Sequence, residues 1–508
     1  METSHVSTFA SEILEEIKTL LHGLISGKKC RRRKVVVNAE EVPSAQQCVF
    51  ILTVEDSVEE ILDDIDEHCM INNFNLDEQS KEVILAGLGR GNGKLVVKIW
   101  KGSARWWNLN SNSVDSPSKI ARLEVAGYKD AGLSIQRFNE YGLLSLEEKE
   151  GKHVVDEILI KSPIIIPEIL FFSLDNVVPN QQNEFYHPWA LIEFIGNDTY
   201  YLTKNEWIQD NHFIRNMIKD REEFGFVEPH PRHGRVSVEL CLDYALHVLK
   251  VVILPIHCAF FLRSFSNNFL KDKEMDTDNV CNTSRAQNIR SSPYRYHDMV
   301  SIYSKALAQL KHKLPSIQND INSCAYVKLK SILFNYEMCV KRLVSESQSM
   351  ENNIKNDIPP VLCHMDLQPQ NMIFIRKKIT IDSVNDFFGN VNSIASVLDW
   401  EEACYADPRF DLILFCRKVL ANRGQADFIW DQYAKSIKSV LKVKQVLIGN
   451  IEPWLKLECV HSLTTLVLQA MDLIGGGRNP WEKKIDLFAK IDREFSRLAT
   501  LGYNNIQP

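Results

Sequence analysis

The stretch HMDLQPQN (residues 364–371), together with LDWE (residues 398–401), decides what the sequence predicts about the fold. Asp366 can accept a proton from a hydroxyl group, while Asn371 and Asp399 offer the carbonyl and carboxylate oxygens that Mg²⁺ prefers as ligands. Transfer of a phosphoryl group needs little beyond a positioned hydroxyl, a base and cations along the phosphates. The spacing of these three residues therefore predicts a site for magnesium-dependent phosphoryl transfer.

Short apolar runs around this stretch predict the strands that hold it. Residues 361–363 (VLC) lead into it, residues 372–375 (MIFI) lead out of it, and residues 394–398 (IASVL) deliver Asp399 at the end of a strand. The polar segment 376–393 between the last two strands predicts an enlarged hairpin loop. The alternative is a set of unrelated polar residues in loops, which the joint pattern with Asp399 disfavours.

The chain resembles the aminoglycoside phosphotransferase group of the protein-kinase-like superfamily, which also contains choline, fructosamine and homoserine kinases. The residues that carry the resemblance are His364, Asp366, Asn371, Asp399-Trp400-Glu401, Asp407-Pro408 and Asp411-Leu412. It implies that Asp366 is the catalytic base and that Asn371 and Asp399 bind magnesium. We expect structural support from His364, Asp407 and Asp411, the two aspartates by capping the helix that starts near Pro408.

The resemblance also implies an α+β fold of two lobes, in which an N-lobe of antiparallel sheet plus helix precedes a mainly helical C-lobe. We expect a partly helical N-terminal extension at 1–74, with an amphipathic helix at 9–25 and an acidic helix at 58–65. The kinase-like N-lobe is expected at 75–196 and the C-lobe at 197–508. Within the C-lobe, we expect the catalytic loop at 361–412, a flexible polar insertion at 264–292, and long helices at 300–313, 326–344, 454–474 and 481–501.

A glycine-rich run, LAGLGRGNGK (residues 85–94), predicts a strand, a tight turn and a second strand at 95–100. Glycines allow backbone N–H groups to approach phosphate oxygens closely. We therefore assign Gly87, Gly89 and Gly91 to ATP binding. Any glycine-rich hairpin would show the same pattern, so this assignment depends on the lysine that follows.

Lys98 alternates with apolar neighbours on the second strand, so its side chain points to one face of the sheet. A lysine there can contact the α- and β-phosphates if an acidic residue holds it. Glu124, on the helical pattern at 118–131, is the expected partner. The alternatives are a solvent-facing Lys98 and an exposed Glu124, and Lys94 and Lys101 are the rival lysines.

Two further apolar runs, at 164–172 and 189–196, read as strands of the same lobe. In the resembling family, the second of them leads into the hinge between the lobes, where backbone groups meet adenine. The resemblance therefore implies that Glu193, Phe194 and Ile195 contribute to ATP binding.

Composition sets limits on the class of protein. The chain has 508 residues, of which 45% are hydrophobic, and a formal net charge of −7, which argues against nucleic acid as a partner. The 12 cysteines are scattered without a Cys-x-x-Cys pair, as expected of free thiols in the cytoplasm. The N-terminus lacks signal-peptide features. The most apolar segment, 248–262, is interrupted by Lys250 and Pro255, so it predicts a buried helix and no membrane span.

The acceptor of the phosphoryl group is predicted to be a hydroxyl of a small molecule. Only seven residues separate Asp399 from Asp407, which leaves no room for the long activation segment of a protein kinase. The polar loop at 223–235 could line the acceptor pocket or connect two helices. The prediction is thus an ATP- and Mg²⁺-dependent phosphotransferase. The alternatives are an inactive nucleotide-binding or scaffold protein and a transferase that moves AMP from the same site.

Overall fold

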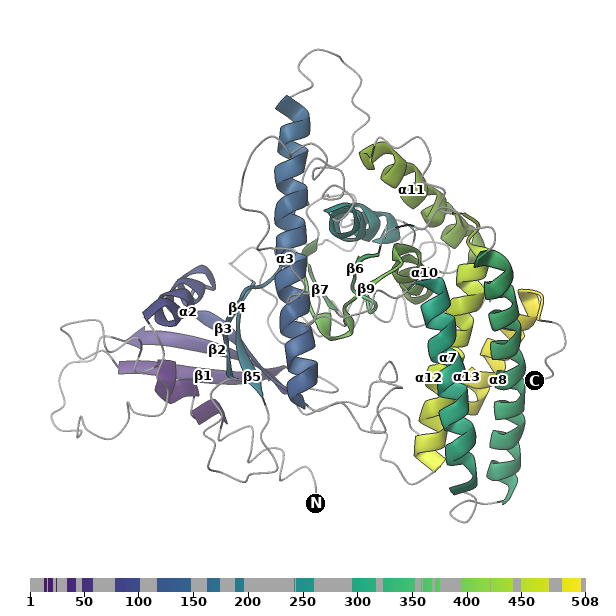
Figure 1. Ribbon diagram of the computed structural model, residues 1–508. Helices are drawn as coiled ribbons and strands as arrows, with labels where there is room; N and C mark the ends of the chain where they lie inside the picture. The colour runs from purple at the N-terminus through teal and green to yellow at the C-terminus, as the bar shows by residue number, and fades with distance from the viewer. Residues whose placement is uncertain are drawn as a thin grey trace, which may run out of the picture.

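The computed structural model describes an N-terminal lobe built on a sheet and a C-terminal lobe built mainly of helices (Figure 1). The long helix α3 (Pro117–Glu147) stands between the sheet and the C-lobe helices (Figure 1). The fold is therefore α+β and bilobal, as the predicted protein-kinase-like fold requires. The residues described are 13–15, 17–21, 24, 34–42, 48–57, 78–100, 117–147, 162–173, 188–195, 242, 244–259, 295–316, 323–351, 358, 360–367, 371–374, 394–420, 422–441, 449–474 and 487–503.

Five antiparallel strands form the N-lobe sheet in the order β1-β2-β3-β5-β4. Side chains of β3 alternate between the two faces because the backbone is extended. Leu95, Val97 and Ile99 join one apolar cluster, while Val96 and Lys98 lie on the face where α3 packs. The strands are β1 (Lys34–Val42), β2 (Cys48–Ser57), β3 (Lys94–Ile99), β4 (Ile169–Phe172) and β5 (Trp189–Glu193).

The sheet begins earlier in the chain than predicted. β1 and β2 lie inside residues 1–74, which were expected to form a separate extension, yet β2 pairs with β3 and places Cys48 opposite Ile99. The β-branched runs VVV in β1 and FILTV in β2 carry the strand signal, and the acidic residues that follow each run obscured it. The acidic helix predicted at 58–65 lies outside the described residues.

A helical segment between residues 13 and 24 covers the outer face of the sheet, within the amphipathic helix predicted at 9–25. Ile17 and Leu21 are fully buried and share a cluster with Leu95 of β3. The chain before the lobe therefore contributes both strands and a covering helix to it.

The glycine-rich run at 85–94 forms the end of a helix, so the predicted strand and turn there are wrong. α2 (Glu78–Arg90) stops because Asn92 and Gly93 adopt positive φ angles of 53° and 79°. The N–H of Gly93 then donates to the carbonyl of Leu88 at 2.9 Å, the hydrogen bond that closes a Schellman-type helix end.

The basis for assigning Gly87, Gly89 and Gly91 to ATP thereby falls away. Gly87 is buried inside α2, where a Cβ atom would clash with the side chain of Leu170 of β4. At Gly91 a Cβ atom would clash with the carbonyl of Lys94. Close packing and helix termination therefore account for the glycines at both positions.

α3 confirms the helix predicted at 118–131 and extends it to Glu147. Ile120 and Val125 pack on the sheet. Gly127 faces the C-lobe, and a Cβ atom there would lie only 2.8 Å from Cβ of Trp400. Glycine at this position therefore allows α3 to contact both lobes.

The C-lobe helices largely follow the predicted patterns. The predicted ranges 300–313, 326–344 and 454–474 lie inside α7, α8 and α12. The segment at 248–262 is helical up to residue 259 and is buried over that range except for Lys250. The predicted insertion at 264–292 and the loop at 223–235 lie outside the described residues. The elements are η3 (Leu249–Ile253), α7 (Tyr296–Lys313), α8 (Ser323–Glu351), α10 (Pro408–Val419), α11 (Arg423–Leu441), α12 (Glu452–Ile474) and α13 (Leu487–Thr500).

Two small antiparallel pairs carry the predicted catalytic loop. β6 (Val361–Cys363) pairs with β9 (Cys404–Ala406), and β7 (Met372–Phe374) pairs with β8 (Ile394–Val397). The strands predicted around the motif are thereby confirmed. No helix in the described part of the chain is long and apolar enough to cross a membrane.

Candidate active site

Asp411, near the start of α10, supports the backbone of the catalytic loop. Its carboxylate accepts hydrogen bonds from the N–H groups of His364, at 3.3 Å, and Met365, at 2.7 Å. Met365 has a φ of 68°, a left-handed conformation that is unfavourable for a residue with a side chain, and the bond to Asp411 helps to hold it there. Asp411 therefore acts through the loop, and the expectation that it caps α10 is corrected.

Asp407 is the N-cap residue of α10, as predicted. Its side chain accepts a hydrogen bond from the N–H of Arg409 at 3.0 Å, and Pro408 occupies the first turn. The guanidinium of Arg409 also pairs with Asp407 at 2.6 Å. The helix that carries Asp411 thus begins at a fixed position directly after β9.

Asp366 lies just after β6, and each of its two carboxylate oxygens contacts another side chain. Nδ2 of Asn371 donates to its carboxylate oxygen Oδ2 at 3.0 Å and to its backbone carbonyl at 2.9 Å. The other oxygen, Oδ1, forms an ion pair with Nζ of Lys418 from α10. Because its side chain remains 24% exposed, the carboxylate can still receive a ligand from solvent.

His364 connects this loop to the strand that delivers Asp399. Its Nε2 donates to the carbonyl of Leu398 at 2.9 Å, so Nδ1 is the acceptor for the N–H of Asp366 at 3.2 Å. The ring also packs on Trp400, with centroids 4.5 Å apart. His364 therefore sets the spacing between the two predicted functional aspartates.

Asp399 ends the β7–β8 hairpin in a left-handed conformation, with φ of 63°. Its N–H donates to the hydroxyl of Tyr128 on α3 at 3.1 Å. Tyr128 lies one helical turn after Glu124 and was missed at the sequence level, where nothing distinguished it from other apolar positions of the helix. Burial raises the pKa of the Tyr128 hydroxyl, which keeps it protonated.

Lys98 meets two acidic residues on the N-lobe side of the site. Its Nζ lies 2.6 Å from Oε1 of Glu124 and 2.9 Å from Oδ1 of Asp399. Trp100 donates from Nε1 to the second oxygen of Glu124 at 2.6 Å. The structure therefore brings Lys98 and Glu124 together, as predicted, and the solvent-facing alternatives do not hold.

The pKa values of Lys98 and Glu124 are both raised, which favours the charged form of the lysine and the neutral form of the glutamate. Burial lowers the pKa of Lys98, but Asp399 and Glu124 outweigh it and leave that pKa well above its usual value. Burial raises the pKa of Glu124, and the charge of Lys98 only partly offsets this. The ionised pair agrees best with the geometry, because both oxygens of Glu124 accept short hydrogen bonds.

Lys94 and the predicted hinge residue Glu193 make other contacts than the Lys98–Glu124 pair. Nζ of Lys94 lies 5.6 Å from the centre of the Phe194 ring, and Lys101 is outside the described residues. The carboxylate of Glu193 pairs with Nε of Arg90 at 2.5 Å, and its N–H donates to the carbonyl of Glu168 at 2.8 Å. A role for Glu193, Phe194 and Ile195 in holding adenine stays a prediction.

The donor set around Asp399 fits a hard divalent cation. Oxygen atoms of Glu124, Asp399 and Glu401 lie within 4.8 Å of one another. Both oxygens of Glu124 accept hydrogen bonds from Lys98 and Trp100, which leaves Asp399 and Glu401 as the acidic donors. Asn371 lies next to the same hairpin, because the N–H of Leu398 donates to its backbone carbonyl at 2.7 Å. Its side-chain amide oxygen is a further oxygen donor. Glu401 was part of the quoted motif but was not predicted as a ligand. Its position two residues after Asp399 was the available signal.

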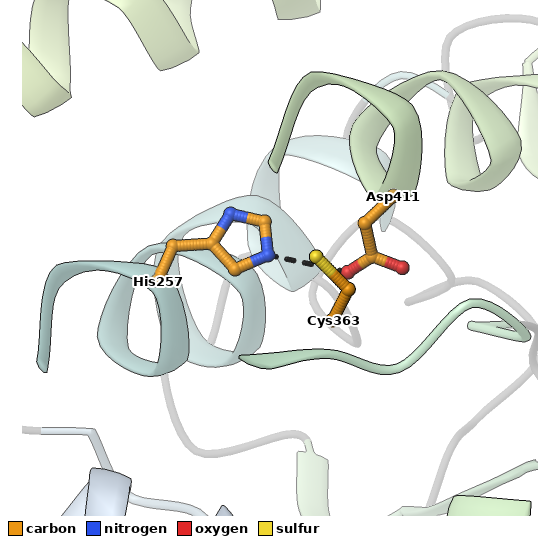
Figure 2. Close-up of side chains that lie close together, drawn as sticks. All are labelled: His257, Cys363 and Asp411. Carbon is orange, nitrogen blue, oxygen red and sulfur yellow. Dashed lines mark hydrogen bonds and ion pairs between the residues drawn. The ribbon is translucent and has the colours of Figure 1, made fainter. Parts of the chain in front are cut away.

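A second cluster, His257, Cys363 and Asp411, has the composition of a transition-metal site but lacks free ligand atoms (Figure 2). His257 donates from Nε2 to Asp411 at 3.2 Å and accepts from Tyr433 at 2.9 Å. Burial raises the pKa of the Cys363 thiol, whose contacts are backbone carbonyls. Since Asp411 also binds the catalytic loop, these groups form a structural network.

Comparison with known proteins gives one partial family match. Residues 257–427 match the family model for choline/ethanolamine kinase. This range contains Asp366, Asn371 and Asp399, while Lys98 and Glu124 lie outside it. No curated protein matches the chain.

Three solved structures show distant likenesses. The protein named APH(2")-IIia, in complex with GDP and kanamycin, has 10% identity and a TM-score of 0.33, over 96% of this chain and 99% of that chain. Spectinomycin phosphotransferase APH(9)-Ia, with ADP and spectinomycin, has 12% identity and a TM-score of 0.27, over 93% and 92%. A Plasmodium vivax ethanolamine kinase has 10% identity and a TM-score of 0.30, over 93% and 83%. Scores at this level do not establish a common fold.

Proposed function

We propose that this protein is an ATP- and Mg²⁺-dependent phosphotransferase that acts on a hydroxyl group of a small molecule. One observation carries the proposal. Lys98 of the N-lobe sheet bonds to Glu124 and to Asp399, and Asn371 bonds to Asp366. The two groups are joined through Leu398, which precedes Asp399 and bonds to the backbone of Asn371 and to the ring of His364. A base, a buried lysine–glutamate pair and oxygen ligands are the parts that phosphoryl transfer requires.

Each residue has a distinct role in the proposed reaction. Asp366 orients the acceptor hydroxyl and takes its proton as the hydroxyl oxygen forms a bond to the γ-phosphorus and the bond to the β,γ-bridging oxygen breaks. Lys98, held by Glu124, binds the α- and β-phosphates. Asn371 and Asp399 would hold Mg²⁺, with Glu401 as a further acidic donor. When bound, Mg²⁺ supplies charge neutralisation along the phosphates.

The segment after Asp399 favours a small acceptor. It runs through η7 (Trp400–Glu402) and β9 directly into α10, and β9 pairs with β6. A peptide substrate would require a platform that this short, paired segment does not provide. The partial family match adds amino alcohols to the candidate acceptors, since choline and ethanolamine name that family.

We further place the lobe boundary after β5, near residue 196, and the protein in the cytoplasm. All seven cysteines in the described part of the chain are free and buried, which agrees with a reducing compartment.

Labelled ATP separates this proposal from its two alternatives. The protein would be incubated with a metabolite library and ATP carrying label on either the α- or the γ-phosphate. Label transferred only from the γ-position supports the phosphotransferase. Transfer of the α-label identifies an AMP transferase, and nucleotide binding without transfer of either label identifies an inactive nucleotide-binding protein.

The Lys98–Glu124 pair is expected to act as a unit. Lys98→Ala removes a charge-assisted contact to the nucleotide worth about 1.5–3 kcal/mol, or roughly 10–150-fold in kcat/KM for ATP. Adding Glu124→Ala should cost little more, because Glu124 acts by positioning Lys98. A double-mutant cycle on kcat/KM for ATP measures this, with Lys94→Ala as the matched control. Additive losses would show that the pair does not function together.

Removal of Asp399 or Asn371 is expected to raise the Mg²⁺ concentration required for half-maximal rate. Each side chain contributes an oxygen ligand, and Asp399→Ala should have the larger effect because a carboxylate carries charge. We expect this Mg²⁺ concentration to rise roughly 10–100-fold, the range of affinity loss that is typical when a residue that orients a metal ligand is removed. Magnesium titration of the initial rate provides the measurement, with the exposed Asp427→Ala as control. An unchanged Mg²⁺ requirement in Asp399→Ala would contradict the assignment.

A further inference from the structure

A lysine from α10 contacts one carboxylate oxygen of the proposed base, and Asn371 contacts the other. Nζ of Lys418 forms an ion pair with Oδ1 of Asp366, and the Lys418 side chain is 30% exposed. The other oxygen, Oδ2, is occupied by Asn371. An acceptor hydroxyl that reaches this carboxylate therefore lies close to the ammonium group of Lys418.

The other cations of α10 are committed to structural contacts. Arg409 pairs with Asp407, and Arg417 pairs with the buried carboxylates of Glu458 on α12 and Glu494 on α13. The pairs of Arg417 connect α10 to α12 and α13. Lys418 follows Arg417 directly, so the buried ion pairs of Arg417 fix the backbone position from which Lys418 reaches Asp366.

Lys98 lies on the proposed nucleotide side of the site, and Lys418 lies beside the proposed base. Lys98 is enclosed by Glu124 and Asp399 on the nucleotide side. Lys418 has Asp366 as its carboxylate partner among the described residues. When Asp366 takes a proton from the acceptor it becomes neutral, and Lys418 then faces the acceptor with a positive charge that Asp366 no longer balances.

Resting on the proposed function, we propose that Lys418 is a specificity-determining residue for the acceptor. Its ammonium group selects acceptors whose groups beside the hydroxyl are uncharged or anionic, and it excludes acceptors with a cationic nitrogen there. Repulsion between two positive charges about 5 Å apart, at an effective dielectric of about 20, would lower kcat/KM for a cationic acceptor by roughly 100-fold. Partial exposure of Lys418 reduces this expectation to about 10-fold or more.

The test uses acceptors sorted by charge. Rates of γ-phosphoryl transfer would be measured for amino alcohols, neutral polyols and hydroxy acids, with the full-length wild type and the Lys418→Glu, Lys418→Gln and Lys418→Arg variants. The readout is the ratio of kcat/KM between charge classes, because damage to the fold lowers the rates for all classes together. Lys330→Glu, an exposed lysine of α8, is the matched charge-reversal control.

We expect wild type and Lys418→Arg to prefer polyols or hydroxy acids over amino alcohols. Lys418→Glu should shift this preference toward amino alcohols by about 10-fold or more, Lys418→Gln should shift it less, and Lys330→Glu should not shift it. Preference of the wild type for amino alcohols, or an unchanged ratio in both Lys418→Glu and Lys418→Gln, would overturn the inference while leaving the phosphotransferase intact. A wild type that labels no acceptor would overturn the proposed function and the inference with it.

Discussion

Asp366→Asn is expected to lower kcat by ~10²–10⁴-fold, the usual cost of losing a general base. The substitution preserves the shape of the side chain, and its amide oxygen can still accept a hydrogen bond from Lys418 or Asn371. It removes the ability to take a proton from the acceptor hydroxyl. Initial rates at saturating ATP and acceptor provide the measurement.

The affinity for nucleotide provides the internal control for this variant. Because Lys98 is held by Glu124 and Asp399, the Kd for ATP should change little. Asp431→Asn, an exposed residue of α11, controls for loss of one negative charge. Turnover of Asp366→Asn near the wild-type rate would show that another group is the base.

Asp411→Ala is expected to lower the free energy of unfolding by roughly 3–5 kcal/mol, as is typical when one partner of a buried charged contact is removed. The side chain is 2% exposed and accepts hydrogen bonds from His364, Met365 and His257. Its loss leaves these donors buried without their acceptor. Urea unfolding gives the stability, and the rate should fall too, because Met365 loses the bond that holds its backbone.

The pH dependence of stability gives an independent check on Asp411. Burial disfavours its charge, but the hydrogen bond from His257, favourable electrostatic interactions with His257 and His364 and the hydrogen bond from the Met365 N–H outweigh burial and lower the pKa of Asp411. A carboxyl group with a lowered folded-state pKa stabilises the fold above its unfolded pKa of about 3.9, and this contribution disappears as pH falls through the folded value.

The stability difference between wild type and Asp411→Ala should therefore shrink in acid below about pH 4. Unfolding curves at a series of pH values measure this difference. The exposed Asp431→Ala should stay within about 0.5 kcal/mol of wild type at each pH. A difference between wild type and Asp411→Ala that does not change with pH would show that Asp411 is not a buried anion.

The catalytic loop was predictable from sequence because its contacts are short in range. Asn371 reaches back only five residues to Asp366, and β7 and β8 form a hairpin that delivers Asp399. The strands β6, β7 and β8 are themselves largely apolar runs of three to four residues, which the sequence shows directly. The C-lobe helices were predictable for a similar reason, since helical periodicity is read within one segment.

The N-lobe was less predictable because its local signals were ambiguous. The run at 85–94 carries four glycines, which suit a hairpin turn as well as a helix end. The helix prevails because Ile84 and Gly87 of α2 pack against the sheet and β4. Likewise, β1 and β2 are strands of this lobe because β2 pairs with β3, a partner more than 40 residues away in sequence.

By itself, the sequence determined the strands around the catalytic loop, and it indicated which residues to propose as base and metal ligands and which class of reaction to propose. Only the tertiary structure decided that Lys98 rather than Lys94 meets Glu124. Residues four apart on a strand lie on the same face, so strand alternation cannot show which of the two lysines the helix will reach. The tertiary structure also decided that Lys418, 52 residues from Asp366, reaches the base. That contact depends on α10 being anchored by Asp411 to the catalytic loop and by Arg417 to α12 and α13, and no periodicity within a single segment encodes such an arrangement.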